Sequence, residues 1–151
     1  MRKTALIVIA LLLFGCGGVV SREARRDVDA TITPAMVQRE PDAYRDRKII
    51  WQGIIVSTKN LRERSIIEVI FTPKEESESR EEAQPSEKRF LIDTVGFLDP
   101  ATYSKGAQIV AAGVVRGIVV QELREEEYPY PVIHPTEMHL FHPKEAPAST
   151  D

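Results

Sequence analysis

The side chains best suited to binding a metal ion lie in one short stretch near the end of the chain. All three histidines fall within nine residues, together with one glutamate: His134, Glu137, His139 and His142. Imidazole nitrogens and carboxylate oxygens are ligands of zinc and copper. If the stretch is a strand, however, Glu137 and His139 share a face and His142 points to the opposite one, and nearby prolines interrupt the geometry. We therefore expect a solvated, partly structural histidine group and no metal site.

A second chemistry is indicated by the single cysteine, Cys16. The residues before it are Leu13, Phe14 and Gly15. They resemble a bacterial lipobox, in which an aliphatic, a tolerated and a small residue precede the cysteine. The small Gly15 gives a signal peptidase access to the scissile bond, and the thiol can carry a thioether-linked diacylglycerol. The amine exposed by cleavage can take an N-acyl chain. We predict Cys16 as the lipid attachment site and expect no other cofactor.

The start of the chain fits this prediction. Arg2 and Lys3 precede ten apolar residues, Ala5 to Phe14, as in the basic and hydrophobic regions of a secretory signal peptide. Ten helical residues cover about 15 Å, half of a hydrocarbon core of roughly 30 Å, so an uncleaved spanning anchor is the weaker interpretation. Residues 1–15 are thus predicted to be removed. Two lipid signals suffice for stable anchoring, and Cys16 would carry three acyl chains.

Charge and length limit the remaining function classes. The chain has 151 residues, enough for one domain, with 20 basic and 23 acidic residues. Loss of Arg2 and Lys3 leaves 18 basic residues against 23 acidic ones, a net charge of −5. Nucleic-acid binding depends largely on neutralising phosphates, so we expect no nucleic-acid partner.

Composition divides the rest of the chain into three parts. Residues 16–31 are expected to form a lipidated, flexible tether, and residues 32–142 the folded domain. Within that domain, residues 74–87 contain six glutamates and no aliphatic residue larger than alanine, which predicts a disordered loop between two strands. Residues 143–151 form a tail.

The pattern of the domain itself predicts an all-β fold. A short helix is expected after Thr33-Pro34, a cap followed by proline at the first turn. Apolar β-branched and aromatic residues then recur with a period of two. The expected strand segments are 48–58, 66–72, 89–94, 108–116, 118–123, 132–133 and 138–141. We predict a small OB-like barrel of five to six strands, with an open sandwich as the alternative.

Three glycines and one loop refine this prediction. Gly53 and Gly113 interrupt good strands, as at bends or bulges of small barrels. Gly117 marks a hairpin or a sharp bend before residues 118–123. The segment 98–106 lies where an OB-fold commonly carries its helix or a shorter substitute.

No catalytic motif is evident. Nucleophile elbows, phosphate-cradling loops and paired acids are absent from the sequence. Asp99 before Pro100 resembles a helix cap or turn residue. Four aromatic residues could line a recognition surface, although core or rim packing is the commoner role of such residues in a small barrel: Trp51, Tyr103, Tyr128 and Tyr130. We predict no catalytic residue.

Four segments taken in order resemble the Slp family of bacterial outer-membrane lipoproteins. They are PDAYRDRKIIWQGIIV (41–56), GFLDPATYSKG (96–106), VVRG (114–117) and EYPYPVI (127–133), followed by the closing MHLF (138–141). The resemblance implies attachment to the outer membrane by lipid and a link with stress or stationary-phase physiology. It implies no catalytic activity.

These observations favour a lipid-anchored, non-enzymatic envelope module that binds an envelope protein or ligand or supports the envelope under stress. Gly17, rather than aspartate, follows Cys16, which favours the outer membrane under the usual sorting rule, with the domain facing the periplasm. The alternative is an envelope hydrolase with an unrecognised site. The ligand, the partner and the oligomeric state do not follow from the sequence.

Overall fold

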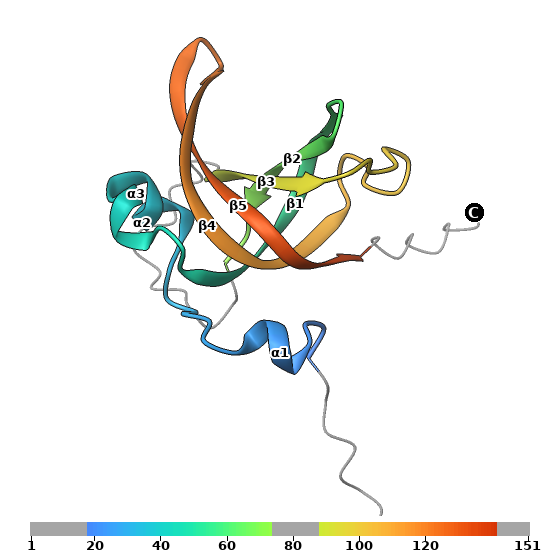
Figure 1. The fold of residues 1–151 in the computed structure, drawn as a ribbon. Coiled ribbons are helices and arrows are strands. Elements are labelled where there is room, and N and C mark those ends of the chain that lie inside the picture. The colour runs from blue at the N-terminus through green and yellow to red at the C-terminus, as the bar shows by residue number, and fades with distance from the viewer. Residues whose placement is uncertain (1–17, 74–87, 142–151) are drawn as a thin grey trace, which may run out of the picture.

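The computed structural model describes residues 18–73 and 88–141 (Figure 1). The predicted signal peptide, Cys16, the acidic loop 74–87 and the tail 143–151 lie outside the described residues. Across the described ranges, no helix has the length and apolar character needed to cross a membrane.

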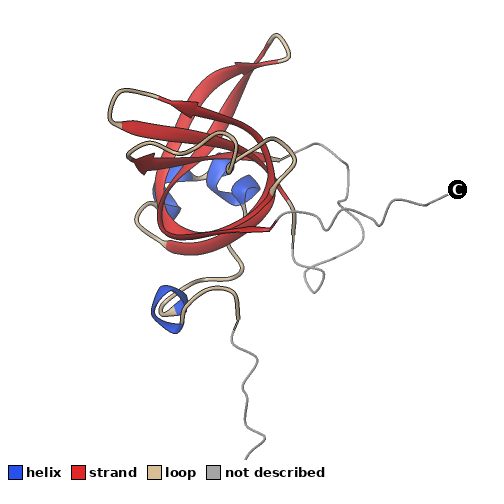
Figure 2. Ribbon diagram, turned by 90° about the vertical axis from the view of Figure 1, so that its right-hand side faces the viewer, coloured by secondary structure: helices blue, strands red, loops and turns tan. Residues whose placement is uncertain are grey.

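Five strands form the body of the domain. They are β1 (Lys48–Asn60), β2 (Arg64–Phe71), β3 (Arg89–Val95), β4 (Gln108–Leu123) and β5 (Glu126–Phe141). The strands close into a barrel in the order β1-β2-β3-β5-β4. The β3–β5 pair is parallel, and the other four pairs are antiparallel. Figure 2 shows the strands closing into a ring. A closed five-stranded barrel in this order is OB-like, so the predicted fold is confirmed.

The barrel interior is filled by the inward side of the period-two pattern. In β1, Ile49, Trp51, Gly53 and Ile55 are buried, while the alternate residues are only partly covered or, like Ile54, exposed. β2 alternates in the same way, whereas four consecutive residues of β3, Arg89 to Ile92, are buried. Side chains from all five strands fill one core cluster. Each fully buried isoleucine stabilises the fold by about 1.5–3 kcal/mol relative to an exposed one. The alternation visible in the sequence is therefore the main source of barrel stability.

Two of the glycines sit where no side chain fits. A Cβ atom on Gly53 would lie 2.0 Å from the carbonyl oxygen of Ile70 in the neighbouring strand. A Cβ atom on Gly113 would lie 2.3 Å from the carbonyl oxygen of His134. The register between β4 and β5 shifts between Ala112 and Gly113, so the bulge expected at Gly113 is present.

Two predicted sets of strand boundaries are wrong. The segments 132–133 and 138–141 are parts of one strand, β5. Residues 118–123 are not a separate strand after a hairpin at Gly117, because β4 runs on to Leu123. Gly117 instead marks a second register shift and adopts a φ of 127°, a conformation that favours glycine. The hairpin turn comes later, at Arg124 and Glu125, both with positive φ. The outer part of β4 and β5 thus forms a long two-stranded arm that rises from the barrel (Figure 1).

Three short helices precede the barrel: α1 (Arg22–Arg25), α2 (Pro34–Arg39) and α3 (Pro41–Tyr44). As predicted, α2 begins with Pro34 after Thr33, whose hydroxyl oxygen accepts from the Met36 N–H. Val37 from α2 is completely buried in the core cluster, so this helix closes one side of the barrel.

Candidate functional site

The site of most interest is the point where the N-terminal segment meets the barrel. Ser21 is the N-cap of α1, and its side-chain oxygen accepts from the Ala24 N–H at 3.2 Å. Ser21 lies five residues after Cys16. Any contact made by Ser21 therefore sets how far the barrel can move from the predicted lipid.

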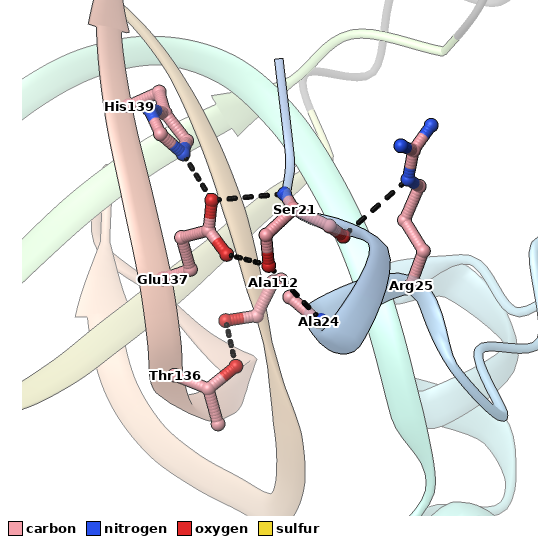
Figure 3. Close-up of polar contacts among 7 residues, drawn as sticks. All are labelled: Ser21, Ala24, Arg25, Ala112, Thr136, Glu137 and His139. Carbon is pink, nitrogen blue, oxygen red and sulfur yellow. Dashed lines mark hydrogen bonds and ion pairs between the residues drawn. The ribbon is translucent and has the colours of Figure 1, made fainter. Parts of the chain in front are cut away.

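Ser21 is held by one carboxylate on β5. The Ser21 N–H donates to Oε1 of Glu137 at 3.0 Å, and the Ser21 hydroxyl donates to Oε2 at 2.7 Å. Nε2 of His139 lies 2.5 Å from the same Oε1 (Figure 3). We call the double contact between serine and glutamate the Ser21–Glu137 latch.

The latch changes the protonation of Glu137. Hydrogen bonds from the Ser21 side chain, then from His139 and the Ser21 backbone, lower the pKa of Glu137 from 4.5 to about 2. The carboxylate is therefore charged across the neutral and mildly acidic range, where it accepts all these bonds.

The bulge at Gly113 determines where Glu137 points. Gly113 pairs with Pro135 and Ala112 pairs with Glu137, so Thr136 is the extra residue on β5. The Thr136 hydroxyl donates to the Ala112 carbonyl at 3.2 Å (Figure 3). Bulges redirect neighbouring side chains, and this one lies directly beside the latch glutamate.

Further contacts tie the segment down on both sides of α1. Val20 is 5% exposed. After the helix, the Asp29 N–H donates to the Lys48 carbonyl at 3.1 Å, and the Asp29 carboxylate pairs with Arg47 at 3.1 Å. A cavity of about 360 Å³ remains between α1 and the barrel. Residues 18–31 thus differ from the flexible tether expected from the sequence, since polar contacts hold them against β1 and β5.

The histidines do not converge. His139 contacts Glu137, whereas His134 is exposed and lies 3.8 Å from an Asp93 oxygen. His142 lies outside the described residues. No group of three or more histidine, cysteine, aspartate or glutamate side chains is placed to hold a metal ion within residues 18–73 and 88–141.

Comparison with known proteins gives one family match. A family model described as "Outer membrane lipoprotein Slp family" matches residues 13–151. The chain belongs to the Slp family. The match begins at Leu13, the first residue of the predicted lipobox, and covers the whole barrel. The resemblance recognised from the four ordered segments is confirmed.

Other comparisons add little to the family assignment. No curated protein matches this Slp-family chain. Among solved structures, it is similar to the Schizosaccharomyces pombe protein Pot1pC bound to ssDNA, with 10% identity and a TM-score of 0.34. That match covers 78% of this chain and 87% of the other.

The four aromatic residues proposed as a recognition surface are not brought together in this Slp-family chain. Trp51 is 2% exposed, and its indole N–H donates to the Ile32 carbonyl at 2.9 Å. Tyr103 packs against the same core cluster. Tyr128 and Tyr130 belong to a second cluster with Leu91 and Val132, where their rings pack edge to face with centroids 4.7 Å apart. Trp51 and Tyr130 are buried, and Tyr103 and Tyr128 are partly buried, so the four rings do not form one exposed surface.

Tyr130 belongs to a polar network that the sequence did not indicate. Its hydroxyl donates to Glu68 at 3.1 Å, and Glu68 also pairs with Arg89 at 2.6 Å. The Tyr128 hydroxyl accepts from the Arg89 N–H. Burial, and then the Glu68 carboxylate, raise the pKa of Tyr130 to about 12. The network joins β2, β3 and β5 near the short parallel pairing at Leu91 that closes the barrel.

Asp99 has the structural role expected of a turn residue. Its carboxylate accepts from the Ala101 N–H at 2.9 Å and from the Thr102 hydroxyl at 3.2 Å. The segment 98–106 contains turns and no helix, which is the shorter substitute considered from the sequence.

Proposed function

We propose that this protein is a non-enzymatic lipoprotein module of the outer membrane, attached through lipid on Cys16 and held close to the bilayer surface. The single observation that carries the proposal is the Ser21–Glu137 latch, which fixes the chain to the barrel five residues after Cys16.

The latch limits the reach of the barrel. An extended chain spans at most about 3.3–3.6 Å per residue, so five residues allow roughly 17 Å between the lipidated cysteine and Ser21. With Asp29 as the first fixed point, thirteen residues would allow roughly 44 Å. In our proposal the barrel therefore works next to the membrane, where it binds an envelope partner or supports the envelope under stress.

Three further points belong to the proposal. Gly17 after Cys16 favours the outer membrane, and we place the barrel on its periplasmic side. The lipid on Cys16 is the only attached group we assign. Asp99 is engaged in a turn, and His139 is in contact with Glu137.

Labelling with radioactive palmitate tests the attachment. Wild type should incorporate label and fractionate with the outer membrane, and Cys16→Ser should lose both. Glu137→Ala is the matched control, because it opens the latch and leaves the lipid in place. Equal labelling of wild type and Cys16→Ser would overturn the proposal. Protease added to intact and to permeabilised cells tests the orientation, since a periplasm-facing barrel is degraded only after permeabilisation.

A further inference from the structure

A second feature lies on the segment between α1 and α2. Residues 28–33, which we call the strap, run from the latched helix α1 to α2 (Figure 1). Between the strap and the barrel is a groove of about 490 Å³. This volume falls in the range of small-molecule binding sites, about 300–1,000 Å³.

The groove has an apolar lining. Val28, Ala30 and Ile32 line it from the strap. Ile50, Trp51 and Phe71 line it from the barrel, with Trp51 and Phe71 in edge-to-face contact. The remaining lining residues are threonine or glutamine, so none of the lining side chains is charged. Such a surface favours a neutral, apolar ligand over an ionic one.

Several polar groups of the groove already bind the protein. The Trp51 indole N–H donates to the Ile32 carbonyl, and the Thr31 hydroxyl donates to Asp29 at 2.6 Å. The Gln52 carbonyl accepts from the Thr72 N–H. A ligand in the groove would therefore gain mainly from burying carbon against carbon.

The position of the groove indicates where such a ligand comes from. Val28 lies twelve residues after Cys16, and the latch holds the intervening helix α1 on the barrel. If the anchor proposed above is correct, the groove lies close to the bilayer surface, where acyl chains are abundant. We propose that the groove binds an acyl chain of a membrane phospholipid. This inference rests on the proposed function for the source of the ligand.

The chain provides its own reporter. Trp51 is the only tryptophan, and it lines the groove. The wild-type protein is incorporated into phosphatidylcholine vesicles that contain phosphatidylcholine brominated on its acyl chains, because bromine quenches tryptophan fluorescence at short range. We expect quenching of Trp51. Ala30→Phe, at an exposed lining position, should fill the groove and abolish most of that quenching. Ala43→Phe, at an exposed position on α3 outside the lining, should leave it unchanged.

A second experiment tests lipid binding by the groove in a chain without the lipid anchor. The Cys16→Ser chain is mixed with brominated lysophosphatidylcholine below its critical micelle concentration. Quenching that is lost in Ala30→Phe supports the groove even if the anchor proposal fails. Equal quenching of wild type and Ala30→Phe in both experiments, or none in either, overturns the inference. Loss of a dimer in Ala30→Phe without any lipid quenching also overturns it, because the occupant is then a second copy of the chain.

Discussion

Removing the latch carboxylate should release the barrel from the membrane surface while leaving the lipid attached. Glu137→Ala removes both oxygens that bind Ser21. Val20 is buried beside Ser21 and should come free with it. The first residue fixed by polar contacts then becomes Asp29, which is held by Lys48 and Arg47. The chain between anchor and barrel grows from five to thirteen residues, and its maximal reach grows from about 17 Å to about 44 Å.

Energy transfer to the bilayer measures this change. Because Cys16 is expected to be lipidated, Gln108→Cys at an exposed position of β4 supplies a unique free thiol for a donor dye. Acceptor lipids are placed in the vesicle. Transfer should fall in Glu137→Ala and stay at the wild-type value in Glu127→Ala, an exposed glutamate on the same strand. Unchanged transfer in Glu137→Ala, with its melting temperature close to wild type, would refute the reasoning that the latch holds the barrel in place.

Three further perturbations have outcomes that the geometry predicts. Protonation of Glu137 should open the latch. Because the folded pKa of Glu137 is lowered to about 2, the stability that the latch contributes is complete above the unfolded pKa of about 4.5 and is lost as pH falls toward 2. Hydrogen exchange of the Ser21 amide should speed up over this range in wild type and not in Glu137→Ala. Glu68→Ala breaks a largely buried ion pair with Arg89 and should destabilise the barrel by about 3–5 kcal/mol in denaturant unfolding, whereas the exposed Glu63→Ala should change little. Gly53→Ala and Gly113→Ala should each lower the free energy of unfolding by about 1–3 kcal/mol through backbone clashes. Only Gly113→Ala should also lower energy transfer, because the bulge at Gly113 directs Glu137. Equal transfer in the two variants would contradict that role.

The barrel could be predicted from the sequence because its stability comes from local patterning. Period-two alternation, as in Ile49 and Trp51, identifies a strand wherever one face is buried. Gly113 indicated its bulge because a glycine inside a strand weakens it and often marks a bulge or a close backbone approach. Gly117 allowed either a hairpin or a bend, and only the pairing of β4 with β5 decides between them.

The latch could not be predicted in the same way. Ser21 and Glu137 are 116 residues apart, and neither residue type is unusual at its position. The sequence did place Glu137 and His139 on one face, and the structure shows that shared face turned toward α1. The burial of Trp51 could not be predicted either. Its hydrogen-bond partner is the backbone carbonyl of Ile32, and a backbone atom leaves no signal in the sequence.

The proposed lipid attachment is tested most directly by the mass of the N-terminal peptide of the protein isolated from membranes. Digestion followed by tandem mass spectrometry should yield a peptide that begins at Cys16 and carries a diacylglyceryl group on sulfur and an acyl chain on the amine. A peptide that begins at Met1, or one in which Cys16 is unmodified, would contradict the proposal.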